Sequence, residues 1–412
     1  MNFLMQKHND ISPLFKQILC LFLLFASCIP GAFSQEHTAT YYSLNEALNN
    51  RKAFMVLDLS DQDLKKVPRK IRKLENMISL DLSGNQIKSI PRFIRKLSSL
   101  NELNISSNRI QKTPKSVLKS QQIRSLDLSY NPLKAFPAEL LYMPALKDLY
   151  LRNMQGAMTL KTPLANIQPS NLELIDLSNN QLTEFPRILH AMPQLTNVFL
   201  SHNQIKQWPQ NELNLSQCLS LDLSHNPMKV ETIPFNTLVN LEELYLNSMQ
   251  IQALPESITS CTQLKVLELD NNAMKTLPKN WEKLTRLETW IMSDNQLQSI
   301  AIDWSVYPFL QKLDLSYNEL THIPDEIGNL TSLQWLNLKG NQLTSVPESI
   351  GRLRLLKKLL LSDNKLTMLP QSMKNLVRLE FLELFNNPIE SNQKPIIRSW
   401  FQDQTFPCTI SF

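Results

Sequence analysis

Apolar residues recur along the chain at spacings that change from strand-like to helix-like within each unit. A clean unit is LQWLNLKGNQLTSVPESIGRLRL, residues 333–355. Leu336 and Leu338 stand two residues apart, which is the period of a β-strand with one buried face. Further on, Ile350 and Leu353 stand three residues apart and predict a short helical turn. One unit cannot bury its leucines alone, so copies of it must stack.

The unit occurs fifteen times with almost no change of length. Successive starts lie 23 residues apart, except for one step of 26 residues from Leu146 to Leu172. The starts are Phe54, Met77, Leu100, Ile123, Leu146, Leu172, Leu195, Cys218, Leu241, Leu264, Leu287, Leu310, Leu333, Leu356 and Leu379. Such regularity over 412 residues predicts one elongated array in place of two or three globular domains.

An asparagine follows almost every predicted strand, and Gln62 opens this column. Because the chain turns inward there, backbone groups lose their sheet partners, and a buried amide can both donate and accept hydrogen bonds. Met154 and Met249 replace the asparagine and predict a cost of about 1–3 kcal/mol each, unless water or a shifted backbone substitutes. These exceptions reflect either drift that a large array tolerates or a surface shaped for binding. The extra residues after Met154, around 156–160, are expected to form a rim over the sheet.

The pattern L-x-x-L-x-L-x-x-N-x-L, followed by x-L-P-x-x-I-x-x-L-x-x-L, resembles the leucine-rich repeat. Its 23-residue form is similar to that of plant intracellular and Ras-pathway scaffold proteins and of bacterial exported proteins, over about residues 54–389. The resemblance implies an α/β fold: a horseshoe-shaped solenoid with a concave parallel sheet and short 3-10 or α turns on the convex side. It also implies a binding scaffold without chemistry of its own.

Both ends of the array are expected to be capped. YYSLNEALNN has capping-box spacing and predicts a short helix within residues 35–53. In residues 390–412, KPIIRSWF predicts a helix and CTISF a last strand. This ending resembles the helix-plus-strand cap of many bacterial leucine-rich repeat proteins.

Residues 1–34 predict export. Lys7 and Lys16 precede the apolar run ILCLFLLFASCI, which is about 12 residues long and short for a bilayer span. We interpret it as a signal peptide cut after Ser34. Two alternatives stay open: LFASC fits a lipobox, with lipidation of Cys28, or the segment is an uncleaved anchor. The first two interpretations place the protein in the periplasm, at the cell surface or outside the cell.

Composition argues against an enzyme. The six Gly are never clustered, so no phosphate-binding loop can be written, and neither H-E-x-x-H nor C-x-x-C occurs. His202 and His225 share a slot in adjacent units, near Asp222, but LSHN is an ordinary turn sequence. We therefore expect no catalysis, no cofactor and no metal. Cys218 and Cys261 replace core residues, as does Cys408, and are expected to be structural.

Charge is unevenly distributed. Residues 51–124 carry 17 Lys and Arg against 6 Asp and Glu, whereas residues 125–412 carry 23 against 28. Two columns in register contribute many of these positive charges: Arg69, Arg92 and Lys115, and Lys73, Lys96 and Lys119. They form either a solvated outer face or a contact for anionic lipid, lipopolysaccharide or acidic glycan. Nucleic acid is not expected, because aromatic residues do not interleave with these charges and the chain is expected to be exported.

The residue between the second and third leucines points out of the concave sheet. From the fifth unit this column contains Tyr150, Asp176, Phe199, Asp222, Tyr245, Glu268, Ile291 and Asp314, and Leu174 and Val266 widen its apolar strip. Exposed aromatic residues among polar ones mark binding surfaces, so this column is the predicted site, with Tyr150, Phe199 and Tyr245 as anchors. Alternatively the slot is merely tolerant, and binding falls to a flank or to Trp335, Leu360 and Phe381.

The sequence therefore predicts an exported, monomeric, non-enzymatic scaffold that binds another protein or peptide on its concave face. The alternative is an envelope-attached structural or adhesion protein that contacts anionic lipid or polysaccharide through its basic end.

Overall fold

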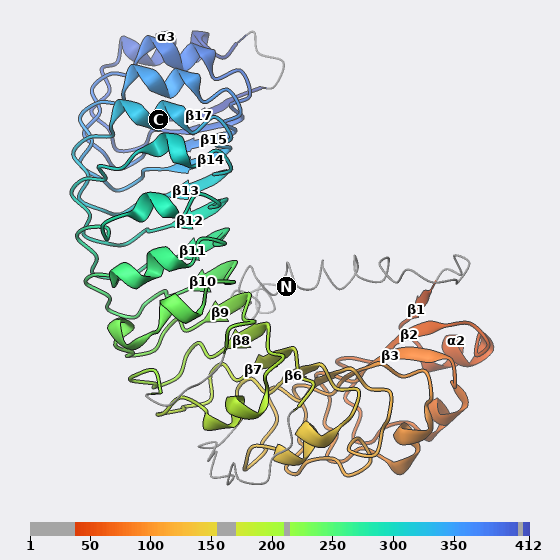
Figure 1. Ribbon diagram of the computed structural model, residues 1–412. Helices are drawn as coiled ribbons and strands as arrows, with labels where there is room; N and C mark the ends of the chain where they lie inside the picture. Colours follow the sequence, from red (N-terminus) through yellow and green to blue (C-terminus); the bar gives the residue numbers. More distant parts are fainter. Residues whose placement is uncertain (1–37, 155–169, 210–214, 403–406) are drawn as a thin grey trace. The chain divides into compact units, whose positions relative to one another are not determined.

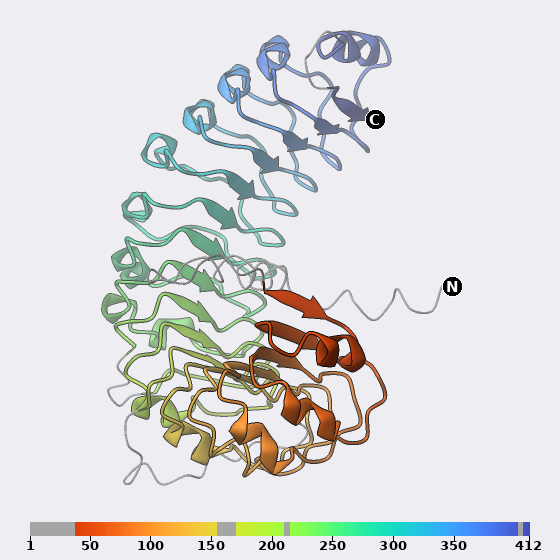
Figure 2. The ribbon, with the colours of Figure 1, turned by 90° about the vertical axis from the view of Figure 1, so that its right-hand side faces the viewer.

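The computed structural model describes residues 38–154, 170–209, 215–402 and 407–412. Within residues 40–412 the repeats form one array, with a parallel sheet on the inner side and 3-10 turns on the outer side (Figures 1 and 2). From β2 to β17, neighbouring strands pair in chain order, and leucine faces leucine, as in Leu313 and Leu336. The leucine-rich repeat horseshoe predicted from the sequence is confirmed.

The strands are short and evenly spaced. They are β1 (Ala39–Tyr41), β2 (Met55–Asp58), β3 (Met77–Asp81), β4 (Glu102–Asn104), β5 (Ser125–Asp127), β6 (Asp148–Tyr150), β7 (Leu174–Asp176), β8 (Asn197–Phe199), β9 (Ser220–Asp222), β10 (Glu243–Tyr245), β11 (Val266–Glu268), β12 (Thr289–Ile291), β13 (Lys312–Asp314), β14 (Trp335–Asn337), β15 (Lys358–Leu360), β16 (Phe381–Glu383) and β17 (Thr409–Ser411).

Most helical turns follow a proline. The 3-10 turns are η1 (Arg69–Lys73), η2 (Arg92–Lys96), η3 (Ala138–Tyr142), η5 (Arg187–Ala191), η6 (Val230–Thr232), η7 (Phe235–Thr237), η8 (Glu256–Ser260), η9 (Trp281–Lys283), η10 (Trp304–Val306), η11 (Asp325–Asn329), η12 (Glu348–Arg352) and η13 (Gln371–Asn375). Proline fixes φ before the first turn, and the following apolar residues point back into the stack. Ile350 and Leu353, for example, are fully buried in a core cluster that runs along the whole array.

The asparagine column ties each turn to the one before it. The Asn341 side-chain oxygen accepts a hydrogen bond from the Leu320 amide at 3.0 Å. Its Nδ2 donates to the carbonyls of Leu315 at 2.9 Å and Leu338 at 3.0 Å. The same bonds recur at Asn108, Asn131, Asn203, Asn226, Asn295, Asn318, Asn364 and Asn387. The predicted role of the buried amide is confirmed.

Backbone groups compensate for the methionine at position 154. With an asparagine at position 154, the Leu133 amide would donate to the side-chain oxygen of that residue. Here it donates instead to the backbone carbonyl of Asn131 at 2.8 Å. The Leu151 carbonyl accepts from Asn180 Nδ2 at 2.7 Å. Carbonyls around Met249 also keep one amide donor each from the neighbouring asparagines. At Met154 a backbone bond of Leu133 therefore substitutes for one bond of the missing amide, whereas at Met249 the bonds described are those that the neighbouring asparagines make in every repeat.

Regular elements cap the array. Helix α2 (Leu44–Asn49) precedes β2, but the Ser43 side chain makes no capping bond, so the predicted capping box is absent. Instead the backbone carbonyl of Ser43 accepts from the Ala47 amide at 3.1 Å. Helix α3 (Gln393–Ser399) precedes β17, which pairs with β16. Residues 1–34, with Cys28, and the expected rim at 156–160 lie outside the described residues.

Candidate functional site

The concave face consists of parallel columns of side chains, because each strand repeats the same register. We call the residue that opens each three-residue strand, such as Trp335 on β14, a first-column residue, and the residue that closes it, such as Asn337, a second-column residue. The register prediction holds: in the second column Phe199 lies between Asp176 and Asp222.

The aromatic residues of the second column are packed rather than exposed. Their exposed fractions are 9% for Tyr150, 5% for Phe199 and 8% for Tyr245, so the prediction that they stand out as exposed anchors is wrong. Ile291 is also buried, at 8%. The second column is the middle line of the face, with the first column on one side, mostly serines on the other, and long side chains above and below. The column forms a floor with little accessible apolar area.

The acids of this column hold the turns after the strands. The carboxylate of Asp176 accepts a hydrogen bond from the Ser178 amide at 2.8 Å, and that of Asp222 accepts from the Ser224 amide at 3.0 Å. Arg152 Nη2 lies 3.3 Å from Asp176 Oδ2 and forms an ion pair with it. Glu268 accepts from Asn247 Nδ2 at 3.1 Å. These hydrogen bonds give the acids a structural role, as expected if they belong to the LDLS sequence that most repeats share.

Burial makes the centre of the face electrostatically unusual. Burial raises the pKa of Asp127 and the pKa of Asp148 to about 6, and Glu173 adds to the shift at Asp148. Burial also raises the pKa of Asp222 and the pKa of Glu268. Desolvated carboxylates that repel one another create a negative potential, which favours a positively charged partner group at this point.

A second set of aromatic residues lies farther along, on β14 to β16. Trp335 and Phe381 occupy the first column on either side of Lys358, and Leu360 closes β15 in the second column. All three apolar residues are only half-buried. The alternative set named from the sequence is therefore the more accessible one.

Lysines surround this second set, and the sequence analysis overlooked them. Lys312 Nζ lies 4.9 Å from the centre of the Trp335 ring, which is a cation–π distance. Lys339 Nζ lies 3.7 Å from both Asp363 and Glu383. The signal was available in the sequence, because Lys312 and Lys358 share the first column with Trp335 and Phe381.

The two basic columns lie on the outer turns. Arg69 and Arg92 open η1 and η2, Lys73 and Lys96 close them, and Lys115 follows in register. Lys119 is the sixth member of the two columns, and all six side chains are exposed. None of them forms an ion pair with another residue in the part of the chain that the structure describes.

The two histidines of the shared slot lie ring against ring. The rings of His202 and His225 are stacked, with centroids 3.9 Å apart and planes inclined by 11°. No group of three His, Cys, Asp or Glu residues suited to a metal occurs among the described residues. Cys218 and Cys261 are fully buried, as expected of structural residues, and burial raises the pKa of each thiol to about 12.

Comparison with protein families agrees with this architecture. A leucine-rich repeat region model matches residues 308–399, and leucine-rich repeat models match residues 53–110, 98–154 and 171–192. The structure is also similar to that of a leucine-rich repeat protein of Leptospira interrogans, with 30% identity and a TM-score of 0.74. The match covers 90% of this chain and 99% of the other. The chain belongs to the leucine-rich repeat family.

Two further solved structures share the fold at lower sequence identity. The leucine-rich repeat ectodomain of the Arabidopsis thaliana receptor kinase GASSHO1/SCHENGEN3, solved in complex with CASPARIAN STRIP INTEGRITY FACTOR 2, is 25% identical over 85% of this chain and 46% of that chain, with a TM-score of 0.55. An internalin of Listeria monocytogenes shares the fold at 20% identity, over 89% of this chain and 88% of the other, with a TM-score of 0.51. No curated protein matches the chain. Leucine-rich repeat domains are commonly scaffolds for protein–protein interaction.

Within the described residues, no helix has both the length and the apolar character needed to cross a membrane.

Proposed function

We propose that this protein is an exported, non-enzymatic scaffold that binds another protein through its concave face. The observation that carries the proposal is the half-buried apolar cluster of Trp335, Leu360 and Phe381, which we call the β14–β16 cluster. Apolar groups rimmed by charged residues mark protein-binding surfaces, and a central aromatic anchor contributes a large share of binding energy. Its position on the sheet, away from the outer turns, favours concave binding.

Charge indicates how a partner lies on the face. The β14–β16 cluster is next to Lys312 and Lys358, whereas the central floor contains Asp127 and Asp222, with Asp148 beside it in the first column. A partner that places acidic groups near the lysines and basic groups over the floor is electrostatically complementary in one orientation only. Such complementarity determines orientation and association rate more than affinity.

The test has two steps. The partner is first identified by affinity capture with the protein in the form that its host produces. The affinity of this partner for variants of the protein is then measured. Trp335→Ala combined with Phe381→Ala is expected to weaken binding at least tenfold, because both anchors are lost. Phe309→Ala is the matched control, since Phe309 is 57% exposed but lies outside the strands. Equal affinity of the double variant and the wild type would exclude the β14–β16 cluster.

Export rests on the sequence of residues 1–34 and is tested separately. If the segment is a simple signal peptide, the Cys28→Ser variant is cleaved as the wild type is, and neither protein carries a lipid label. Loss of processing and of lipid label in this variant would instead establish the lipoprotein alternative.

A second function is favoured by the basic columns. Their six exposed side chains have no described ion-pair partners and share the same outer side of adjacent repeats, which suits an anionic lipid or glycan surface. Replacing Arg69, Arg92 and Lys115 with Gln is expected to abolish salt-sensitive retention on acidic liposomes. Unchanged retention would exclude this contact.

A further inference from the structure

The third repeat lacks apolar volume at a position that its neighbours fill. The residue before the repeat's proline is Ile90 in the second repeat and Phe136 in the fourth, but Thr113 in the third. Ile90 and Phe136 are 8% and 6% exposed, so this column is part of the packed core. Thr113 has one side-chain heavy atom fewer than Ile and four fewer than Phe, and its hydroxyl makes the position less apolar.

A second core position in the same repeat is also reduced. Leu97 and Met143 end the outer turns of the second and fourth repeats and are buried, whereas Ser120 stands in the third. The Ser120 hydroxyl is buried and has no hydrogen-bond partner among the described residues. Residues 115–119 form an irregular turn where the adjacent repeats have η2 and η3. The third repeat is therefore both less apolar and less regular than those beside it.

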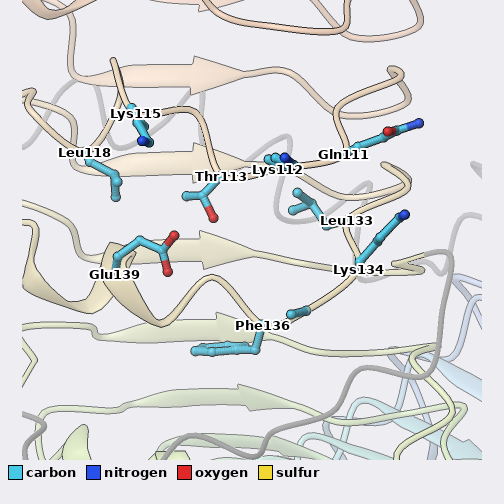
Figure 3. A pocket seen from close by; sticks show the side chains of 10 residues that line it. Gln111, Lys112, Thr113, Lys115, Leu118, Leu133, Lys134, Phe136 and Glu139 are labelled. Carbon is cyan, nitrogen blue, oxygen red and sulfur yellow. The ribbon is translucent and has the colours of Figure 1, made fainter.

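A hollow that includes Thr113 in its lining lies between the third and fourth repeats (Figure 3). Its volume is about 430 Å³, within the range of about 300–1,000 Å³ that small-ligand sites occupy. The side chains of Leu118, Leu133 and Phe136 supply its apolar lining, and Thr113 lies among them.

The rim of the hollow is positively charged. Lys112, Lys115 and Lys134 line it, against the single acid Glu139. All three lysines are exposed, and none forms an ion pair with another described residue. Lys115 is also the last member of the basic column that begins at Arg69, so the positive surface of the outer turns continues to the hollow.

We propose that the hollow binds one alkyl chain of an anionic amphiphile, whose carboxylate or phosphate is attracted by the lysines of the rim. Each buried methylene raises affinity by about fourfold, so the apolar lining supplies binding energy that the lysines alone do not. One chain without charge contacts binds only marginally, whereas one chain together with a basic patch binds stably. The third repeat has both features at one place. This proposal does not depend on binding at the concave face. It deepens the proposed contact with an anionic surface, and it rests on that function only if the amphiphile is a membrane lipid.

The first experiment measures binding of monomeric dodecanoate to the full chain by calorimetry. Thr113→Phe places in the hollow the larger residue that the fourth repeat already accepts at Phe136, and it is expected to raise Kd at least tenfold without a large change of unfolding temperature. Lys112→Gln combined with Lys134→Gln is expected to raise Kd at least fivefold and to weaken its salt dependence without altering the core. Lys374→Gln, an exposed lysine on η13, is the charge control and should leave Kd unchanged.

Equal dodecanoate affinity of the wild type and both hollow variants would overturn the proposal, as would equal affinity for the uncharged dodecyl maltoside. Binding of an acidic peptide without binding of dodecanoate would overturn it as well, because a protein partner would then be indicated. Vesicles of phosphatidylglycerol, compared with phosphatidylcholine, distinguish the source of the amphiphile. If Thr113→Phe loses both dodecanoate and vesicle binding, the ligand is a membrane lipid; if it loses dodecanoate alone, the ligand is a free amphiphile. If only the lysine variant loses vesicle binding, the result supports the contact with an anionic surface. The dodecanoate measurement then decides whether the hollow binds an alkyl chain.

Discussion

The centre and the far end of the concave face both contain aromatic residues, but they present them differently. Tyr150, Phe199 and Tyr245 close their strands and are at most 9% exposed. Trp335 and Phe381 open theirs and are half-buried. A shift of two residues along a strand moves a side chain from the middle line of the face toward its edge, where fewer neighbours cover it. The column in which an aromatic residue lies therefore decides whether it stabilises the fold or can meet a partner.

The surrounding charges sharpen the same contrast. Acids that are bound to the turns separate the central aromatics, whereas exposed lysines flank Trp335 and Phe381. A carboxylate that holds a turn is not free to meet a partner, but an exposed lysine can reach a bound acid. The β14–β16 cluster therefore offers more groups for recognition than the centre does.

The largest effect is expected from truncating equivalent aromatics in the two regions. Phe199→Ala should lower the free energy of unfolding by about 3 kcal/mol, because it leaves a cavity in a packed column. Phe381→Ala should cost less than half of this, since its ring is already partly in water. Denaturant unfolding monitored by circular dichroism measures both. Equal losses would contradict the difference in packing between the two regions.

Removing a buried charge from the centre is expected to stabilise it. Asp127→Asn retains the bond that the Asp127 carboxylate accepts from the Ser129 amide at 2.8 Å, because Asn104 accepts the equivalent bond from Ser106 on the adjacent strand. The gain should be about 1 kcal/mol at pH 7, since the variant no longer desolvates a charge. Asp325→Asn, on the exposed turn η11, is the control and should change stability little.

The pH dependence of this gain provides its own check. Burial raises the pKa of Asp127 in the folded protein to about 6, above the value of 3.8 expected when unfolded. The penalty for the charged form is therefore complete above pH 6 and is lost as the pH falls from 6 toward 3.8. The difference in unfolding free energy between variant and wild type should shrink over that window. A constant difference would mean that the carboxyl is not desolvated.

A smaller effect of opposite sign is expected from the histidine stack beside the centre. Burial lowers the pKa of His225, so the folded protein disfavours its protonation, and a charged His202 at 3.9 Å would oppose it further. Stability should fall as the pH drops below 6.5 and should be independent of this group above it. His225→Gln should remove that part of the pH dependence in thermal unfolding between pH 5 and 8. A variant with the unchanged profile would exclude the stack as its source.

The smallest effect is expected at the far end. Lys312→Gln removes the cation above the Trp335 ring and should cost about 0.5 kcal/mol, because the pair is exposed. It should nevertheless reduce affinity for an acidic partner more than it reduces stability. Lys374→Gln again serves as the control, and equal effects of the two substitutions on unfolding would show that the ring contact contributes nothing.

The repeat register was predictable from the sequence because it depends on local periodicity alone. The strands, the outer turns and the bonds of Asn341 all follow from where leucine, proline and asparagine stand within each unit. Even the alternation of Phe199 with Asp176 and Asp222 could be read directly, since stacking puts equivalent residues side by side.

Exposure was not predictable in the same way. Whether Tyr150 is covered depends on the lengths of side chains in adjacent columns and on the curvature of the sheet, neither of which one repeat determines. The failed capping box at Ser43 has a similar origin, because side-chain geometry at a short terminal helix depends on neighbours such as Gln62, which donates to the Tyr42 carbonyl at 3.2 Å. The hollow at Thr113 was visible in the sequence as a gap in one column, but that column was not compared.

The asparagine column gives the array a direction in time. Each buried amide reaches backward, so the turn of one repeat receives its bonds only when the following repeat is in place, as Leu320 does from Asn341. A chain made from its amino end must therefore leave its newest turn incomplete until about 21 further residues have emerged, the separation between those two partners. Assembly should advance one repeat behind synthesis, and a break in the middle of the array should leave an amide donor without its side-chain acceptor on the amino-terminal fragment and an asparagine Nδ2 without one of its carbonyl acceptors on the carboxy-terminal fragment.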